Sequence, residues 1–409
     1  MKKLLFLLIP LIAFSQSFLI SEIPIPKTYI QNLDPYPCEE RCLQEYIDND
    51  MIFSFLANAK KKLPNKQQDE IRMMNISILN LDTNIISSDL KIAILLPYKK
   101  IGRYATTTTN SAFAYLITKN HNFELKSYKI ENETKEDINK AIQQIKNDGF
   151  GYVVAPLTHD GATTLIDINP DVYVYIPTVN KRDINSSSEY IYYGGIDYKA
   201  QSDILLKEAT SPLVIFHDRS KIGTNLSNYE KESFIKIQND QNITQQNNKI
   251  VEFSIPRRIT NLKRQLQDNE NIVEGSFFLN TPIVKSGMIM SQITLYDLNA
   301  TNILSTQINY DPLLLSMTQY NDRKDMIVAN SITKQNNVLI ESNSLLGNDI
   351  VYDWINYTTT IGVDYFFSMM TNQQRQYNIE IKDNQMQYDI ELLRPSLSRF
   401  VKYVSLFKE

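Results

Sequence analysis

The sequence predicts an α/β protein built from two Rossmann-like parallel-sheet lobes joined by a hinge, and two observations lead to this fold class. Short apolar runs alternate with segments of helical periodicity from about residue 90 to residue 308. The run at residues 92–96 is apolar throughout and stops at Pro97, which is typical of a strand buried on both faces. The chain has 409 residues, 43% of them hydrophobic, which is enough for two or three domains or lobes.

Residues 1–18 have the pattern of a signal peptide. Lys2 and Lys3 supply the charged end, residues 4–14 the apolar stretch, and residues 13–15 a small-x-small cleavage site. The apolar stretch is shorter than the roughly 20 residues that span a membrane, although an uncleaved anchor is the alternative. We therefore expect residues 1–15 to be removed. The mature chain is then expected in the periplasm of a Gram-negative bacterium, without a transmembrane segment.

The N-terminal extension, residues 16–88, is expected to be partly helical, with helical spacing over residues 39–62. It holds the only two cysteines of the chain, Cys38 and Cys42. An even pair of cysteines in an oxidising compartment suggests a disulfide. A bridge between positions one helical turn apart is geometrically awkward, so reduced or intermolecularly paired thiols stay open as the alternative.

The two lobes follow in order along the chain. The first, residues 89–198, has predicted strands at 92–96, 123–130, 152–157, 172–179 and 190–196, and predicted helices at 107–118 and 134–147. Thr134 and Asp137 begin the second of these helices with a capping-box pattern. The second lobe, residues 199–309, has predicted strands at 213–217, 250–255, 276–279 and 303–308. Such alternation means parallel pairing with right-handed crossovers.

Residues 310–409 are expected to return to the first lobe and to end in a helix and a hairpin. The apolar runs 326–329 and 338–340 are predicted to be strands of that lobe. Alternating apolar residues over 377–393, around the turn at 382–385, predict a β-hairpin.

The apolar segment at residues 350–370 has the length of a membrane span. It contains Asp353, Asn356 and Asp364, however, which indicate a buried helix of a soluble protein.

Polar side chains follow several predicted strands, at the edge where an open α/β sheet places its ligand crevice. These candidate ligand-binding residues are Arg103, Tyr104, Thr106, Thr158, His159, Asp160, Thr178, Asn180, Gly195 and, in the second lobe, Asp218. Hydroxyls and N–H groups at a helix N-terminus favour an anionic group. The threonines at 106–109 are equally consistent with an N-cap, and residues 158–161 with an ordinary turn.

Known catalytic motifs are missing from the sequence. It contains no GxSxG, HExxH, GxxxxGK[ST] or GxGxxG pattern, and its three histidines are scattered singly. The pair His217 and Asp218 at a strand end fits a cap or a cleft wall as well as it fits catalysis. The net charge of −4 gives no basic patch for nucleic acid. We therefore expect a non-enzymatic protein without a cofactor, a metal site or a nucleic-acid partner.

Four segments resemble the type I periplasmic binding proteins. They are KIAILLP at 91–97, GYVVAPLTHDGATTLI at 151–166, VYVYIPTVN at 172–180 and PLVIFHDRSKIGTNLSNYEKESF at 212–234. Ala155 stands where that superfamily usually has glycine. Within it, the C-terminal part resembles the penicillin-binding-protein activators (the LpoA-like group), through GVDY at 362–365 followed by a hairpin. The lipid-acceptor cysteine and the large helical-repeat domain of that group have no counterpart in this sequence.

The resemblance implies two classes of function. The first is a periplasmic interaction protein that regulates peptidoglycan synthesis through a protein partner such as a cell-wall synthase. The second is a solute-binding protein that closes two lobes over an amino acid or a peptide fragment. Ala155 in place of glycine, and Asp160 in the expected ligand loop, favour the first class.

Overall fold

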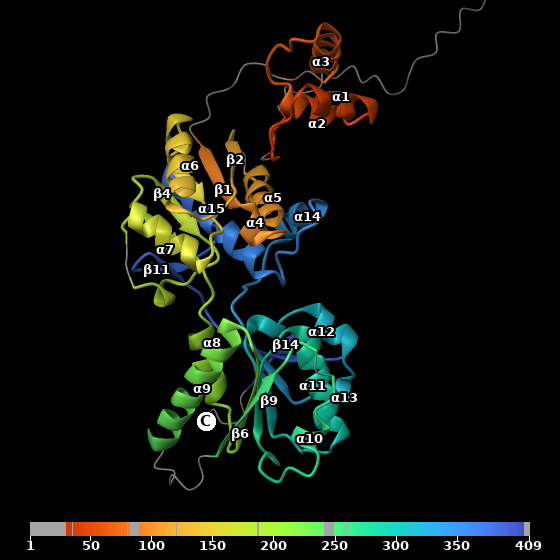
Figure 1. The fold of residues 1–409 in the computed structure, drawn as a ribbon, viewed down its shortest axis with the longest axis vertical. Coiled ribbons are helices and arrows are strands. Elements are labelled where there is room, and N and C mark those ends of the chain that lie inside the picture. Colours follow the sequence, from red (N-terminus) through yellow and green to blue (C-terminus); the bar gives the residue numbers. More distant parts are fainter. Residues whose placement is uncertain are drawn as a thin grey trace, which may run out of the picture. The chain divides into compact units, whose positions relative to one another are not determined.

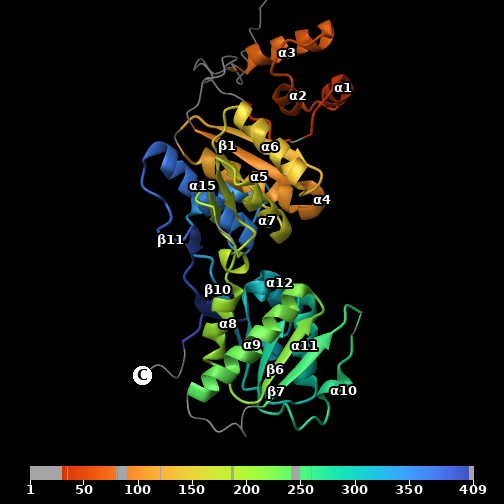
Figure 2. The same cartoon turned by 60° about the vertical axis from the view of Figure 1, so that its left-hand side comes forward.

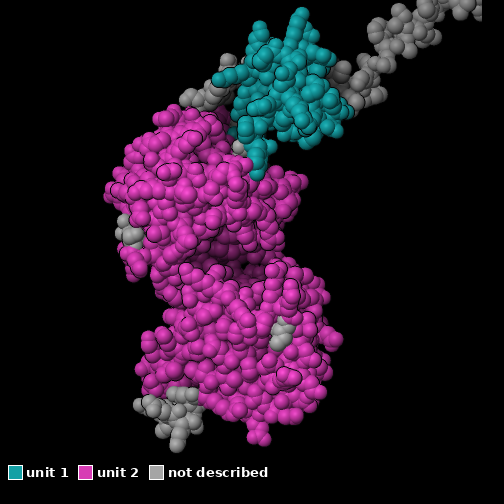
Figure 3. All heavy atoms as spheres, in the orientation of Figure 1, with its two compact units in different colours: residues 1–87 teal, residues 88–409 magenta. Residues whose placement is uncertain are grey.

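The computed structural model describes residues 30–34, 36–79, 81, 90–119, 121–185, 188–240, 249–258 and 260–404. The chain divides into two compact units, unit 1 (Met1–Ser87) and unit 2 (Ser88–Glu409) (Figure 3). The predicted signal peptide lies outside the described residues. No helix in the described ranges is long and apolar enough to cross a membrane.

Unit 1 forms helices α1 (Glu40–Asp48), α2 (Ile52–Asn58) and α3 (Lys66–Ile78) among its described residues. The single helix predicted over residues 39–62 is wrong. The chain turns at Asp50, whose φ of 55° lies in the left-handed region and cannot continue a helix. A small apolar core of Leu43, Phe55, Leu56 and Ala59 holds the helices together.

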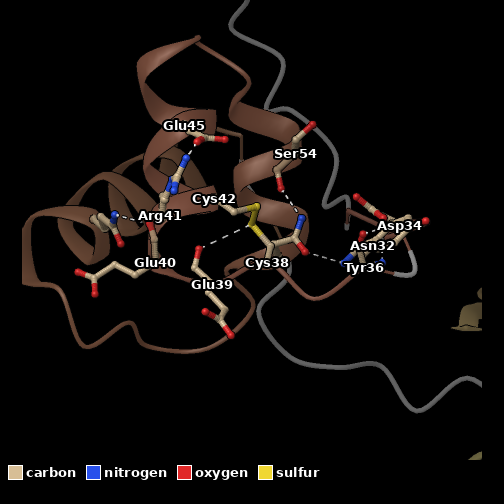
Figure 4. Close-up of a disulfide and its surroundings, with 12 residues drawn as sticks. Asn32, Asp34, Tyr36, Cys38, Glu39, Glu40, Arg41, Cys42, Glu45 and Ser54 are labelled. Atoms are coloured by element: carbon tan, nitrogen blue, oxygen red, sulfur yellow. Dashed lines mark hydrogen bonds and ion pairs between the residues drawn. A yellow bond between two sulfur atoms is a disulfide. The ribbon is translucent and has the colours of Figure 1, made fainter.

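Cys38 and Cys42 form a disulfide, which confirms the favoured alternative (Figure 4). Their Cα atoms lie 5.4 Å apart. Cys38 precedes α1, because Glu39 is the N-cap and has an extended backbone, whereas Cys42 lies in the first turn. The bridge therefore links the incoming chain to the helix and does not join two helical positions.

Replacing both cysteines by serine is expected to destabilise unit 1 by about 2 kcal/mol, because a short cross-linked loop no longer restricts the unfolded chain. Hydrogen exchange measures this effect. Amides of α1 should lose protection by about thirtyfold, while amides of unit 2 provide the internal control. Unchanged protection in α1 would show that the bridge does not support the fold.

Unit 2 contains two seven-stranded sheets, each of which forms one lobe (Figures 1 and 2). The first sheet contains β1 (Lys91–Pro97), β2 (Glu124–Ile130), β3 (Tyr152–Val154), β4 (Tyr173–Ile176), β5 (Ile191–Tyr193), β11 (Glu380–Lys382) and β12 (Gln385–Gln387). The second contains β6 (Leu213–Asp218), β7 (Ile250–Ile255), β8 (Ser276–Asn280), β9 (Asn302–Ser305), β10 (Met326–Asn330), β13 (Glu391–Pro395) and β14 (Phe400–Lys402). The strand orders are β11-β12-β5-β4-β3-β1-β2 and β14-β13-β10-β9-β8-β6-β7.

Strands β1 to β5 and β6 to β10 pair in parallel within their sheets, and β12 pairs in parallel with β5. The antiparallel pairs among the described residues are β11 with β12, β10 with β13 and β13 with β14. The predicted fold class is confirmed. Ile92 to Leu96 of β1 are fully buried, as the unbroken apolar run predicted.

Helices cover both faces of each sheet. The helices of the first lobe are α4 (Tyr98–Ile101), α5 (Tyr104–Ile117), α6 (Lys135–Asn147), α7 (His159–Ile168), α14 (Asn337–Leu345) and α15 (Trp354–Thr371). The helices of the second lobe are α8 (Tyr198–Leu206), α9 (Lys221–Asp240), α10 (Lys263–Leu266), α11 (Ile283–Leu295), α12 (Pro312–Met317) and α13 (Tyr320–Arg323). In the second lobe, α8 and α9 supply the core on one face, and α10 to α12 supply it on the other.

The prediction that residues 310–409 return to the first lobe as a block is wrong. β10 pairs with β9 of the second sheet, and residues 338–340 lie in α14 and form no strand. The predicted hairpin is present as β11 and β12, but β13 leaves it to pair with β10. An apolar run signals a buried strand, yet the run itself does not specify which of two similar sheets receives it.

The chain therefore crosses between the lobes three times, at residues 194–197, 331–336 and 388–390, which we call the hinge segments. The first two crossings leave from the carboxyl ends of β5 and β10. The carboxyl edges of the two sheets consequently face each other, and the surface of unit 2 is hollowed between the lobes (Figure 3).

Candidate functional site

The residues predicted after the first strand lie in a helix and not in a loop. α4 follows β1 directly, Gly102 turns the chain with a φ of 54°, and Arg103 is the N-cap of α5. The helix predicted at residues 107–118 therefore begins three residues earlier, at Tyr104, and the N-cap role for residues 106–109 is wrong. Thr107 and Thr109 donate their hydroxyls to helical carbonyl oxygens of Tyr104 and Ala105.

Arg103 is an exposed residue whose pKa is influenced by carboxylates of both lobes. Its guanidinium lies 5.4 Å from the centre of the Tyr104 ring. A side-chain hydrogen bond with Tyr104, followed by the charges of Asp353 in the first lobe and Asp311 in the second, raises the pKa of Arg103 above its usual value. Thr106 is exposed on α5.

Thr158 binds a carboxylate that belongs to the chain itself. It is the N-cap of α7, and its N–H donates to Oε1 of Glu133 at 2.7 Å. Its hydroxyl donates to Oε2 of the same side chain and accepts the N–H of Gly161 at 3.3 Å. A Cβ on Gly161 would overlap the Glu133 carboxyl group. The anion-binding end of α7 is thus occupied by Glu133, a residue that the sequence did not single out.

The polar groups after β4 and β5 bond to one another. The Thr178 hydroxyl donates to the carbonyl oxygen of Leu157. Asn180 is buried; its Oδ1 accepts the N–H of Arg182 at 2.9 Å, and its Nδ2 donates to the carbonyl of Gly195 at 3.0 Å. Thr158, Thr178, Asn180 and Gly195 therefore lie together at one edge of the first sheet, as predicted, but their hydrogen-bonding groups are paired within the protein.

The remaining candidates lie apart from this set or are exposed. His159 Nε2 lies 2.7 Å from the carbonyl oxygen of Asp183, and Asp160 is almost fully exposed. In the second lobe, Asp218 Oδ1 accepts the N–H of Ser220 at 3.1 Å. His217 Nδ1 lies 2.7 Å from the carbonyl oxygen of Asp218. Neither of these histidines is paired with a serine or cysteine among the described contacts.

The interior of the second lobe holds a carboxylic acid without a cationic partner among the described residues. Glu230 of α9 is fully buried, and it accepts hydrogen bonds from the Ser202 hydroxyl at 3.0 Å and from Asn280 Nδ2 at 2.5 Å. Burial raises the pKa of Glu230 to about 8, against the two hydrogen bonds that lower it. Glu230 lies four residues after Leu226 and four before Phe234, so helical periodicity places it on the buried face of α9 although its side chain is ionisable.

Replacing Glu133 by alanine is expected to destabilise unit 2 by about 2 kcal/mol, because two charge-assisted hydrogen bonds are lost and the N-terminus of α7 is left without its anion. Free acetate should restore part of the lost thermal stability in a saturable manner.

The matched control is Glu189→Ala, which removes an exposed acid of the first lobe. Acetate should not stabilise this control, nor the double variant Glu133→Ala/Thr158→Ala. A Glu133→Ala protein as stable as the wild type would contradict the role assigned to this carboxylate.

No family model and no curated protein matches the sequence. Solved structures do match. A putative branched-chain amino acid ABC transporter protein from Rhodospirillum rubrum has a TM-score of 0.61 at 8% identity, over 77% of this chain and 99% of that one. The C-domain of LpoA from Haemophilus influenzae, a regulator of PBP1A, has a TM-score of 0.51 at 11% identity, over 77% and 100%.

Full-length LpoA from Haemophilus influenzae matches 89% of this chain and 68% of its own length, with a TM-score of 0.54 at 12% identity. Unit 2 alone cannot supply that coverage, so the match takes in part of unit 1. These identities establish the fold alone: unit 2 has the fold of the type I periplasmic binding proteins. Binding proteins and a regulator share that fold.

Proposed function

We propose that this chain is an extracytoplasmic, non-enzymatic interaction protein that regulates a cell-wall synthase by direct contact. The observation that supports this proposal most strongly is the Glu133 carboxylate at the N-terminus of α7. An incoming carboxylate ligand would have to displace it. Thr178, Asn180 and Gly195 beside it are also committed to internal hydrogen bonds. Because these groups are already paired, this edge of the cleft offers little to a small ligand. Such a protein is better suited to binding a protein partner through its outer surface.

Solute binding is the second candidate, and it rests on structural neighbours that are named as proteins of branched-chain amino acid transport. The two candidates differ in a measurable way. A solute binder should gain about 2.7 kcal/mol of stability at a hundredfold excess of ligand over Kd. An interaction protein should gain nothing from any free amino acid.

The deciding experiment combines a thermal-shift screen of the mature chain against amino acids and muropeptides with a direct binding assay on a purified bifunctional cell-wall synthase. We expect no shift with amino acids and saturable binding of the synthase. Glu133→Ala should acquire a shift with small carboxylates that the wild type lacks. A clear thermal shift of the wild type with an amino acid, together with no affinity for the synthase, would favour solute binding over the interaction function.

A further inference from the structure

Three apolar side chains on the surface of the second lobe surround a buried arginine. Leu397, in the turn between β13 and β14, is 74% exposed, Tyr320 of α13 is 44% exposed and Met317 of α12 is 39% exposed. The buried side chain is Arg323 of α13, whose guanidinium lies 6.0 Å from the centre of the Tyr320 ring. Its Nη2 donates to the carbonyl oxygen of Leu397 at 3.1 Å, and its Nη1 donates to the hydroxyl of Thr318, the residue after Met317, at 3.1 Å. Leu397, Tyr320 and Met317 are therefore close together, and we call them the α13 patch.

Arg323 also fixes the conformation of the turn that carries Leu397. Its Nη2 and Nε donate to the carbonyl oxygen of Ser396 at 3.1 Å and 3.4 Å. Within the turn, the N–H of Ser396 donates to the carbonyl oxygen of Arg399 at 2.8 Å, and the N–H of Arg399 donates to the Ser396 hydroxyl at 3.3 Å. The backbone on both sides of Leu397 is therefore held in place, while the leucine side chain stays exposed.

The buried position is unfavourable for the charge of Arg323. Its hydrogen bonds among the described residues go to Thr318, Ser396 and Leu397, and none goes to a carboxylate. Burying a guanidinium without an anionic partner costs free energy, and this burial lowers the pKa of Arg323. The result is an ordered turn with an exposed leucine. Apolar and aromatic side chains that are ordered before binding are typical of the centre of a protein–protein interface.

The exposed charges beside the turn are mostly positive. In residues 319–325 and 391–402, the exposed charged residues that form no ion pair among the described residues are three cations and one anion: Lys324, Arg394, Arg399 and Asp325. Glu391 and Lys402 pair with each other at 3.1 Å. A partner that is complementary to this surface therefore carries carboxylates.

The other carboxylates of α12 and α13 do not cancel this excess of cations. Asp322 is buried, and its Oδ2 accepts the Ser291 hydroxyl at 2.8 Å, so its charge offsets that of the neighbouring Arg323. Asp311 is the N-cap of α12, at the opposite end of that helix from Met317. Two copies of the chain that met through their α13 patches would bring like charges together, so a second copy is not complementary to this surface.

We propose that the α13 patch is the surface through which this chain binds its protein partner, and that the partner offers an apolar pocket rimmed by carboxylates. Leu397 enters the pocket, and Tyr320 and Met317 pack on its wall. Lys324 and Arg399 pair with the carboxylates of the rim. This assignment rests on the proposed function, because the partner assigned to the surface is the cell-wall synthase.

Biolayer interferometry with a purified bifunctional cell-wall synthase and the mature chain tests this surface. Leu397→Asp should weaken binding at least about thirtyfold, the effect of a hot-spot residue, and Tyr320→Ala about tenfold. The matched control is Leu345→Asp, because Leu345 lies in α14 of the first lobe and is 86% exposed. The control should bind like the wild type. Since both leucines are exposed, both aspartate variants should also melt like the wild type, so a loss of binding is not a loss of fold.

Charge reversal tests the carboxylates expected on the partner. Arg399→Glu and Lys324→Glu should each slow association about tenfold at an ionic strength of about 50 mM, with a smaller difference at about 500 mM, because salt screens the charges at the rim of an interface. Lys140→Glu, at an exposed position in α6 of the first lobe, is the control. Association rates of Arg399→Glu and Lys324→Glu equal to that of this control would contradict the carboxylate rim.

Arg323→Met tests the role of the ordered turn. It should speed hydrogen exchange at residues 396–399 and weaken synthase binding about tenfold. In the Leu397→Ala background the same change should weaken binding no further, because Arg323 acts through Leu397. A loss of the same size in both backgrounds would mean that Arg323 supports the fold and not the binding of Leu397.

These measurements separate the α13 patch from the proposed function. If the wild type binds the synthase and Leu397→Asp binds equally well, the α13 patch is not the contact surface, whereas the proposed function stands. If the wild type does not bind the synthase, both are wrong. Another occupant would be identified if Leu397→Asp dissociated a wild-type dimer in sedimentation velocity, or if Arg399→Glu abolished binding to vesicles of phosphatidylcholine and phosphatidylglycerol in equal parts. Either result would overturn the proposal.

Discussion

Replacing Gly362 by alanine is expected to destabilise unit 2 by about 3 kcal/mol, at the upper end of what overpacking a core usually costs. Gly362 lies in α15, and a Cβ added there would overlap the Cδ1 and Cε1 atoms of the Tyr175 ring. Tyr175 belongs to β4 and is fully buried. Its hydroxyl donates to the carbonyl oxygen of Thr358 at 2.8 Å, one helical turn from Gly362. Neither the ring nor the helix can move aside without breaking this bond.

Urea unfolding followed by fluorescence measures the effect, since the chain has one tryptophan, Trp354, at the start of α15. Gly287→Ala in α11 is the matched control. Its added Cβ would meet Thr318 Cγ2 at 3.1 Å and Met317 Cε at 3.2 Å, and the flexible Met317 side chain can yield. The control should stay within about 1 kcal/mol of the wild type, because alanine also favours the helix. A loss no larger than that of the control would disprove the packing argument.

Local signals in the sequence were sufficient for most elements of the fold. The capping pattern at Thr134 predicted the start of α6, and the Thr134 hydroxyl accepts the N–H of Asp137 at 3.2 Å. The turn residues Asp383 and Asn384 predicted a hairpin, and their φ angles of 49° and 63° are those of a turn between β11 and β12. In each case the residues whose pattern predicts the element also make the contacts or adopt the backbone angles that form it.

Long-range pairing could not be predicted in the same way. β10 is an apolar run like β4, and the order of strands along the chain favours neither sheet for it. β10 pairs with β9 because β9 offers an unpaired edge and because the chain crosses between the lobes at the hinge segments. Both causes involve residues that are far apart in the sequence. The predicted return to the first lobe failed for this reason.

The position of the candidate site could be predicted from the sequence. The internal hydrogen bonds that its polar groups form could not. Thr158, Thr178 and Asn180 do follow neighbouring strands and lie at one sheet edge. Whether a hydroxyl at such an edge binds a ligand or a group of the protein depends on side chains and carbonyl oxygens from other parts of the sequence that lie next to it in the fold. Glu133, in the loop after β2, is such a group, and no motif marks it.

Unit 2 is expected to lose on the order of 4 kcal/mol of stability between about pH 4.5 and pH 8.5 through the single group Glu230. Burial raises the pKa of Glu230 to about 8 in the folded protein, whereas the ordinary value is 4.5. Between these values the folded chain holds a proton that the unfolded chain has released. The contribution to stability is therefore complete below about pH 4.5, declines as the pH rises through 8, and is constant above that.

Glu230→Gln isolates this contribution, because glutamine stays neutral at every pH. Asn280 Oδ1 has no hydrogen-bond partner among the described residues, and the Asn280 amide group can be turned by 180° in place. After a flip, Asn280 Oδ1 can accept a hydrogen bond from the N–H of the new amide, as it can from the O–H of the protonated acid.

The variant should match the wild type near pH 4.5 and exceed it in stability by several kcal/mol near pH 9. Chemical denaturation of both proteins across this range measures the difference, and other titrating groups cancel because they are common to the two chains. Glu136→Gln, at an exposed position in α6, is the control and should show no such divergence. A difference between Glu230→Gln and the wild type that stays constant from pH 4.5 to pH 9 would mean that Glu230 is already ionised in its buried site. The hydrogen bonds from Ser202 and Asn280 would then have to stabilise a full negative charge without a cationic partner.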